Sequence, residues 1–268
     1  MAPRIWGEST HKPCRRLYDN KSFPKGRSRR AKMSYWMFIL LFLSVIISGI
    51  SVLFINISGK NLKLILSFSG AFLFAICALH LIPEIYLSGT PNVGIYILIG
   101  FFAQILLEFL SEGIEHGHIH VHKHAGHAFP YAMMIGLSIH SFLEGMPLAN
   151  TGTNSHNSLL TGIIMHNIPI AMALMTMLLK SHIRKQNAIL WLIIFALVTP
   201  LGTFMSYAIG QNIIGNFSIY FDRIMAVVIG IFLHISTTIL FESSENHRFN
   251  FIKFLVIMLG AGFAIMSM

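Results

Sequence analysis

The sequence predicts an all-α integral membrane protein with eight transmembrane helices and no separate soluble domain. Of its 268 residues, 54% are hydrophobic and only 11% are charged, whereas a soluble domain carries about a quarter charged residues. A membrane-spanning helix needs roughly 20 apolar residues, and eight segments approach or reach that length. Each apolar run is continuous rather than alternating, which favours helices over the strands of a barrel.

The eight expected spans are separated by short, mostly polar connections. In chain order they are Tyr35–Ile57, Leu64–Tyr86, Val93–Leu110, Ala128–Leu148, Leu159–Leu179, Ala188–Ile209, Ile224–Phe241 and Phe249–Met268. Residues 33–268 therefore form one membrane domain. Residues 1–32 form a basic N-terminal extension.

Basic residues predict how the domain is oriented. Eight of them follow the first, third, fifth and seventh spans, namely Lys60, Lys63, Lys123, Lys180, Arg184, Lys185, Arg248 and Lys253. Only Arg223 follows an even-numbered span. Because cytoplasmic loops are enriched in Lys and Arg, we expect the first group to be cytoplasmic and both termini to lie outside. The basic extension contradicts this orientation. It is a targeting segment, or it is tolerated outside, or Met33 is the natural first residue and the extension is non-native or disordered; we favour the last explanation.

A faint internal repeat suggests related halves. Residues 70–84 read GAFLFAICALHLIPE and residues 230–242 read GIFLHISTTILFE, each with G-x-F-L early and a glutamate at the end. Under this interpretation spans one to three and six to eight form two inverted halves around spans four and five, a 3+2+3 arrangement. Inverted repeats are typical of transporters, whose binding site lies near the midplane between the halves.

Three ionisable residues inside the fourth and fifth spans are the strongest candidates for chemistry. His140 and Glu144 share one helix face because they are four residues apart. A rise of roughly 1.5 Å per residue places His140 about 12 Å and His166 about 10 Å from the outer ends of their helices. Two imidazoles and a carboxylate suit Zn²⁺ and similar divalent cations. The Asn167 carbonyl is a further candidate ligand.

Prolines support a functional interpretation of this region. Pro147 removes the donor for the Leu143 carbonyl, and Pro169 removes the donor for the Met165 carbonyl. Carbonyls freed at membrane depth need a partner, a cavity or water. The alternative is that His140, Glu144 and His166 only hydrogen-bond across a packed bundle.

Secondary candidates lie at other depths. They are His80 and Glu84 in the sequence HLIPE, Glu108 and Glu112 near the end of the third span, and His234 and Glu242 in the seventh. The first pair would form an entrance, add ligands or simply reach water at the helix end. Glu108 and Glu112 would line an exit, unless Glu112 is only solvated. The loop at 111–127 contains six histidines, and such tracts bind metal loosely or are simply solvated.

Together HSFLEG in the fourth span, MHNIP in the fifth and HLIPE in the second resemble the ZIP (Zrt/Irt-like) metal transporters. The eight spans, the outward termini and the His-rich loop are also similar. The resemblance covers residues 33–268. It implies a 3+2+3 fold that imports divalent metal, commonly zinc, with His140, Glu144 and His166 as primary ligands. It also implies that Ser141 and Asn167 contribute to a second, adjacent site.

One residue departs from the family pattern. The fifth-span motif of the family usually reads H-x-x-P-E-G, but this chain reads HNIPIA, with Ile170 in place of the glutamate. The departure argues against a two-metal centre and leaves Glu144 as the carboxylate of a single site.

The sequence therefore predicts transport of Zn²⁺, or of Fe²⁺ or Mn²⁺, toward the cytoplasm across the plasma or inner membrane, without a cofactor. Two other functions stay open, an intramembrane zinc hydrolase and a membrane metal sensor that does not transport. The expected partners are metal ions and the lipid bilayer, not nucleic acid, and the sequence leaves open whether the chain is a homodimer.

Overall fold

The computed structural model describes residues 35–55, 57–111, 131–149, 156–181, 183–210, 220–242 and 250–267. The chain divides into two units, residues 1–30 and residues 31–268. Every described residue belongs to the second unit. The basic extension at 1–32 and the His-rich loop, including Glu112, lie outside the described residues, apart from the helical residue Ser111.

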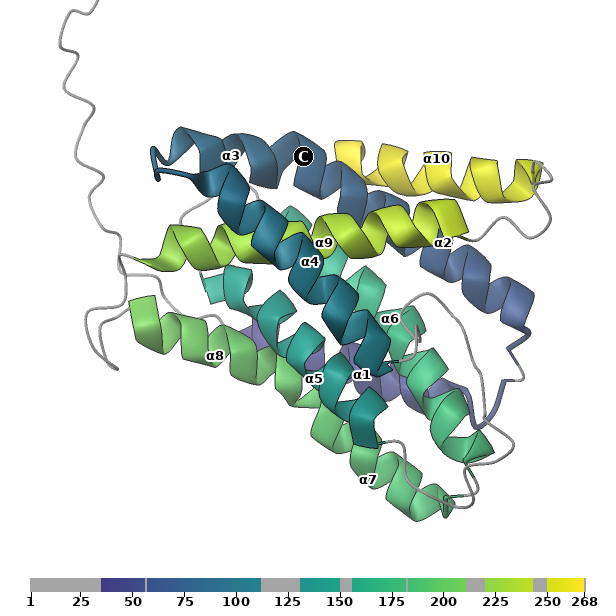
Figure 1. Ribbon diagram of the computed structural model, residues 1–268. Helices are drawn as coiled ribbons and strands as arrows, with labels where there is room; N and C mark the ends of the chain where they lie inside the picture. The colour runs from purple at the N-terminus through teal and green to yellow at the C-terminus, as the bar shows by residue number, and fades with distance from the viewer. Residues whose placement is uncertain are drawn as a thin grey trace, which may run out of the picture. The chain divides into compact units, whose positions relative to one another are not determined.

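The described part of the chain is helical and contains no strand, in agreement with the predicted fold class (Figure 1). Its α-helices are α1 (Tyr35–Ser51), α2 (Gly59–Ile76), α3 (Ile82–Leu87), α4 (Val93–Ser111), α5 (Tyr131–Gly145), α6 (His156–Lys180), α7 (Lys185–Ala196), α8 (Val198–Gly210), α9 (Phe221–Glu242) and α10 (Phe251–Met266). A π turn, Cys77–Leu81, joins α2 to α3, and a 3₁₀ turn, Met146–Ala149, follows α5.

Within these ranges, six of the eight expected spans are long and apolar enough to cross a membrane. They correspond to α2 with α3, to α4, to α5 with its 3₁₀ turn, to α6, to α7 with α8, and to α9. The first and last spans are the shorter apolar helices α1 and α10, of 17 and 16 residues.

Two spans that the sequence presents as continuous are interrupted. The second contains the π turn, in which the Ile82 amide bonds the Cys77 carbonyl, because Pro83 directly afterwards has no amide proton to continue the α-helical pattern. The sixth breaks at Leu197 between α7 and α8. Pro200 explains this break in the same way, since it cannot donate to the Ala196 carbonyl four residues earlier.

Helices pack in pairs that are distant in the sequence: α4 with α9, α2 with α10, α1 with α6, and α5 with α8. Glycines allow the α4–α9 pair to approach closely. A Cβ atom on Gly100 would lie 1.8 Å from the Val227 carbonyl oxygen, and one on Gly230 would lie 1.9 Å from that of Ile97. Small residues at such contacts are typical of membrane helices.

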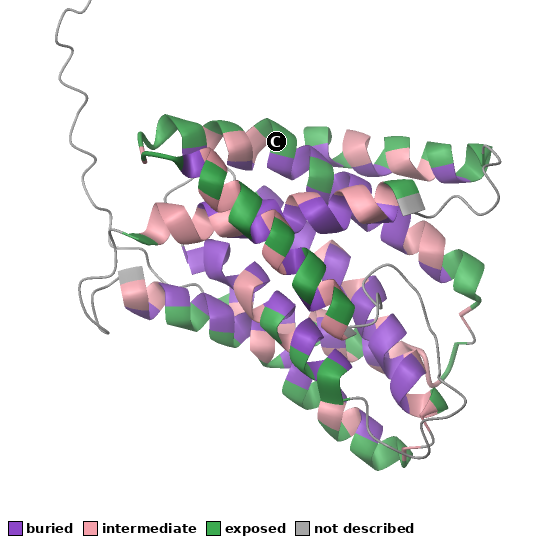
Figure 2. Ribbon diagram, in the orientation of Figure 1, coloured by how far each residue is buried: buried purple, intermediate pink, exposed green. Residues whose placement is uncertain are grey.

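Burial differs between central and peripheral helices (Figure 2). In the most apolar stretch of α6, 67% of the residues are buried, against 22% in α4. The outward side of α4 consists of large apolar side chains, among them Leu98, Phe102 and Phe109. Such a surface is expected for a helix that faces lipid.

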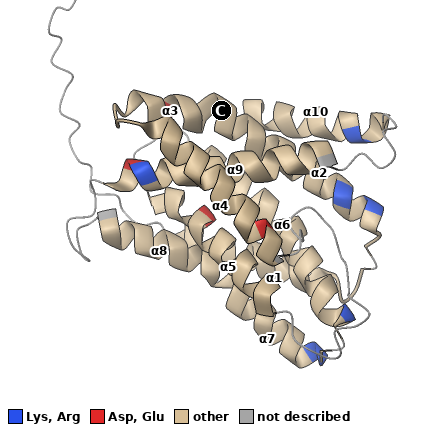
Figure 3. Ribbon diagram, in the orientation of Figure 1, with Lys and Arg blue, Asp and Glu red and all other residues tan. Residues whose placement is uncertain are grey.

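Charged residues lie at helix ends and rarely between them (Figure 3). Lysines occupy the beginnings of α2, α7 and α10 and the end of α6. Lys253 at the start of α10 donates a hydrogen bond to the Leu240 carbonyl near the end of α9, at 2.9 Å. The beginning of α10 therefore lies beside the end of α9. Arg223, in the first turn of α9, lies at that helix's other end.

Candidate metal centre

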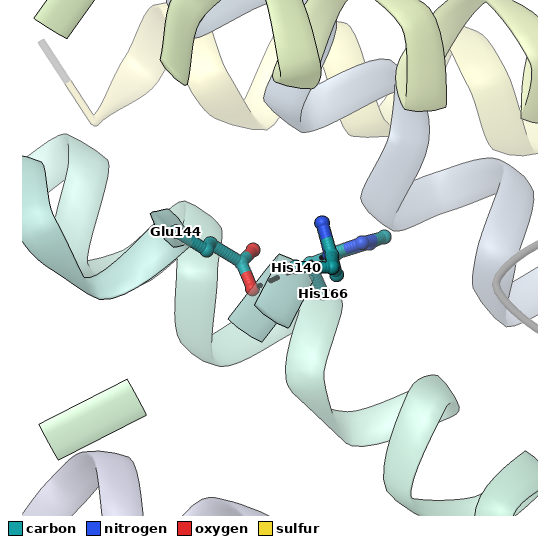
Figure 4. Close-up of side chains that lie close together, drawn as sticks. All are labelled: His140, Glu144 and His166. Carbon is teal, nitrogen blue, oxygen red and sulfur yellow. Dashed lines mark ion pairs between the residues drawn. The ribbon is translucent and has the colours of Figure 1, made fainter. Parts of the chain in front are cut away.

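Three ionisable side chains meet inside the apolar helical unit. His140 and Glu144 extend from one face of α5, and His166 extends toward them from α6 (Figure 4). One ligand atom from each residue lies within 4.8 Å of the other two, and all three side chains are fully buried. Within the described residues this is the one group of three or more His, Cys, Asp or Glu side chains close enough to share an ion.

The imidazoles and the carboxylate are arranged around a common point. His140 Nε2 and Glu144 Oε2 are 3.7 Å apart, and the two imidazole rings are nearly perpendicular, with centroids 6.0 Å apart. Donors bound to one tetrahedral zinc ion would lie about 3.4 Å apart, given bonds of about 2.1 Å. Small side-chain rotations would therefore bring all three ligand atoms to bonding distance.

The chemistry of the cluster favours a cation. Neither carboxylate oxygen of Glu144 accepts a hydrogen bond from the part of the chain that the structure describes. A carboxylate buried in this way is costly unless a positive charge compensates it. Two neutral imidazoles and one carboxylate would leave a divalent ion with a net charge of +1, which allows binding without trapping the ion.

The end of α5 is shaped by Gly145 and Pro147. The α-helix stops at Gly145 and continues as the 3₁₀ turn that contains Pro147. The Gly145 carbonyl accepts a hydrogen bond of 2.8 Å from Thr203 Oγ1 of α8. A carbonyl left over where α5 ends therefore finds a polar partner, and α8 holds the turn that carries Glu144.

Apolar clusters close the site on both sides along α5 and α6. One cluster contains Leu137 and Ile170, and the other contains Leu148 and Ile163. From the first cluster to the second, residue numbers rise along α5, from Leu137 to Leu148. They fall along α6, from Ile170 to Ile163, so the two helices run antiparallel past the site. Their most extensive backbone contacts are with other helices: α5 packs on α8 and α4, and α6 packs on α1 and α2. The ligand side chains therefore fill a wider gap between α5 and α6.

Other predicted residues of this region are also buried. Ser141 and Asn167 have no solvent exposure, and neither the Ser141 hydroxyl nor the Asn167 amide has a hydrogen-bond partner among the described residues. Ile170 is buried in the apolar cluster one helical turn after His166.

The structure does not bring His80 or Glu84 into the three-residue cluster. His80 is half-buried in the π turn, and Glu84 is half-buried in α3 after Pro83. The π turn also changes the helical phase between the two residues, so their spacing of four does not have its usual α-helical meaning.

A separate polar contact joins α4 and α9. Glu108 Oε2 lies 3.6 Å from His234 Nε2, and the His234 ring packs edge-on against Phe101 with centroids 4.9 Å apart. One turn before Glu108, Gln104 is fully buried, and its amide has no hydrogen-bond partner within the described ranges. Gln104 was not predicted from the sequence, although an amide four residues before a carboxylate in an apolar helix is a signal of a buried polar contact. Glu242 ends α9, and its side chain lies outside the described set.

Comparison with known proteins points to one family. The family model described as "ZIP Zinc transporter" matches residues 118–268, more than half of the chain. Zinc transporter ZIP1 of Danio rerio is 24% identical over 189 residues, which cover 53% of this chain and 62% of the relative. Zinc transporter ZIP1 of Mus musculus is 24% identical over an alignment of 285 residues, which covers 85% of this chain and 87% of the relative. Protein zntD of Dictyostelium discoideum is 26% identical over 172 residues, which cover 58% of this chain and 25% of the relative.

Proposed function

The chain belongs to the ZIP zinc transporter family, and from that premise we propose that it carries divalent metal cations, zinc first among them, across a membrane toward the cytoplasm. Members of the family are transporters rather than enzymes, which argues against the hydrolase alternative. In the proposal, His140, Glu144 and His166 bind the ion during its passage, with Asn167 as an additional oxygen ligand.

One observation carries this proposal: a carboxylate and two imidazoles are fully buried together between apolar clusters. Ionisable groups inside membrane spans are rare and are typical of ion pathways. A cluster that served packing alone would be better replaced by apolar side chains of similar volume.

The apolar clusters suggest how the ion is released on one side only. The cluster with Leu148 and Ile163 would separate the site from the outside, and the cluster with Leu137 and Ile170 would separate it from the cytoplasm. Transport would require one cluster to open while the other stays closed, as in alternating access. On the cytoplasmic side the ion would pass the Glu108–His234 pair before reaching Glu112 and the His-rich loop at 111–127.

Helix pairing supports the finer 3+2+3 arrangement. In that arrangement α1, α2 and α4 correspond to α7–α8, α9 and α10, while α5 corresponds to α6. When each helix is replaced by its counterpart in the other half, the α4–α9 contact becomes the α10–α2 contact. In the same way, the α1–α6 contact becomes the α8–α5 contact. All four pairs are among the principal contacts between helices, as an inverted repeat would require.

The charge distribution supports outward termini. Basic residues at the beginnings of α2, α7 and α10 and at the end of α6 would face the cytoplasm, and Arg223 would face outside. The family and the apolar helices make the chain an integral membrane protein, and we assign it to the plasma or inner membrane. The proposal needs no cofactor and is compatible with a monomer or a homodimer.

The ligand set favours zinc without excluding other divalent ions. Imidazole suits zinc and iron, whereas manganese prefers a site richer in oxygen. Because Ile170 replaces a carboxylate, the site has one negative charge, and we expect weak binding with fast release rather than tight storage.

Flux in sealed proteoliposomes tests the function. We expect Zn²⁺ to enter vesicles that contain the purified protein, with slower entry of Fe²⁺ and Mn²⁺. Protein-free vesicles provide the background. Calorimetric binding of Zn²⁺ without flux for any of the three metals would refute transport and favour the sensor alternative.

A further inference from the structure

An apolar cavity of about 520 Å³ opens between α4, α5 and α9, and none of the three metal-cluster residues lines it. Its walls include Phe142 and Leu143 from α5, Met146 from the following 3₁₀ turn, and Ile224 and Val227 from α9. Its volume lies within the usual range of ligand pockets. Its lining side chains are apolar apart from three residues: Arg223, Tyr96 and Tyr220.

Arg223 contacts the rings of both tyrosines. Its guanidinium carbon is 5.6 Å from the Tyr96 ring centroid and 5.3 Å from that of Tyr220. These cation–π contacts hold the guanidinium in place. They do not occupy its N–H groups, which can still donate hydrogen bonds to an anion. Within the described chain, no carboxylate pairs with Arg223. The neighbouring acid, Asp222, accepts a hydrogen bond of 2.8 Å from Thr90 Oγ1 instead.

The position of this group matches the level of lipid headgroups. Arg223 lies in the first turn of α9 and Tyr96 in the first turn of α4, so both are at the same end of two apolar spans. Tyrosines are enriched at membrane–water interfaces, and guanidinium groups bind phosphate with good geometry. From this level the cavity continues along the apolar side chains of α5 and α9.

We propose that this cavity is a binding site for an anionic glycerophospholipid. Its phosphate would lie on the Arg223 guanidinium, and one acyl chain would occupy the space between α5 and α9. The lipid would contact Leu143 and Met146, which flank Glu144 in the sequence. The proposal is independent of metal transport, because lipid binding can be measured without metal.

A second cavity provides an internal comparison. It measures about 470 Å³ and lies between α1 and α8, where Tyr35, Phe38, Leu201 and Phe204 are among its lining residues. No charged side chain lines it. A neutral cavity of similar size should accept acyl chains without preference for an anionic headgroup.

Native mass spectrometry of the full-length chain in detergent micelles tests the proposal. Dioleoyl phosphatidylglycerol and dioleoyl phosphatidylcholine share their acyl chains and differ in headgroup charge. We expect the unaltered protein to bind the phosphatidylglycerol more tightly. Arg223→Gln should weaken that binding about tenfold, the loss expected for one charge-assisted hydrogen bond. It should weaken phosphatidylcholine binding less, because the choline ammonium already offsets the charge of that lipid's phosphate.

Two matched variants act as controls. Arg184→Gln removes an exposed arginine that lies just before α7 and lines neither cavity, and it should leave phosphatidylglycerol binding unchanged. Ile224→Trp fills the charged cavity and should abolish the headgroup preference, whereas Leu201→Trp in the neutral cavity should retain it. Circular dichroism confirms that each variant is folded.

Three results would overturn the proposal. They are equal binding of the two lipids by the unaltered protein, unchanged phosphatidylglycerol binding by Arg223→Gln, and an equal loss in Arg184→Gln.

Discussion

Glu144 supplies the negative charge of the candidate metal centre. Its carboxylate is fully buried beside His140 and His166, and nothing else in the cluster compensates the charge of a divalent ion. The sequence indicated these three residues because spacing and depth along two helices can be calculated from helical geometry. It did not indicate how far apart α5 and α6 lie, since that distance depends on packing with α1, α2, α4 and α8.

A substitution at Ile170 changes the charge of the site through one side chain. It lies one turn after His166, as Glu144 lies one turn after His140. We expect Ile170→Glu to tighten zinc binding at least about tenfold. The corresponding free energy is only a small part of the attraction between opposite charges about 4 Å apart in a partly desolvated site. Isothermal titration of the purified protein measures the affinity.

Ile170→Gln is the matched control, because it has the size and polarity of glutamate without the charge. We expect it to bind zinc no more tightly than the unaltered protein. An unchanged affinity in Ile170→Glu would mean that residue 170 does not face the metal.

Close contact between α5 and α8 defines the site at the level of helices. A Cβ atom on Gly145 would lie 2.2 Å from the Thr199 carbonyl oxygen, and one on Gly202 would lie 1.9 Å from that of Phe142. Gly145, directly after Glu144, therefore lets α8 approach the end of α5 closely. The partner surface on α8 was not predictable, because it depends on which helices meet.

Gly202→Ala should therefore separate α8 from α5. Overpacking of this kind costs on the order of 1–3 kcal/mol, so we expect the melting temperature in detergent to fall by several degrees. Gly262→Ala in α10 is the control, since no atom lies within 4 Å of its added Cβ. Equal melting temperatures for the two variants would contradict the close α5–α8 contact.

Elements interrupted by proline were the least predictable part of the fold. Hydrophobicity alone located the second and sixth spans, but it gave no sign of the π turn before Pro83 or of the break at Leu197. Such interruptions depend on where the freed carbonyls find new partners, which is a property of the folded bundle. Helices α1 and α10 coincide with the first and last predicted spans but are shorter than predicted.

At the scale of the whole molecule, the basic helix ends predict how the protein is oriented in the membrane. We expect a C-terminal epitope tag to be accessible to antibody in intact cells that express the protein. A tag inserted between Lys180 and Lys185 should become accessible only after the membrane is permeabilised. The opposite pattern would place the termini inside and reverse the proposed direction of transport.

Transport through the His140–Glu144–His166 cluster is tested most directly by radiolabelled zinc uptake into sealed proteoliposomes. We expect Glu144→Ala to reduce uptake to the level of protein-free vesicles, because the buried site then has no negative charge to hold the ion. Asp222→Asn is the control: it removes a carboxylate that is hydrogen-bonded to Thr90 outside the cluster, and uptake should persist. Uptake by Glu144→Ala equal to that of the unaltered protein, at equal protein per vesicle, would contradict the proposed pathway.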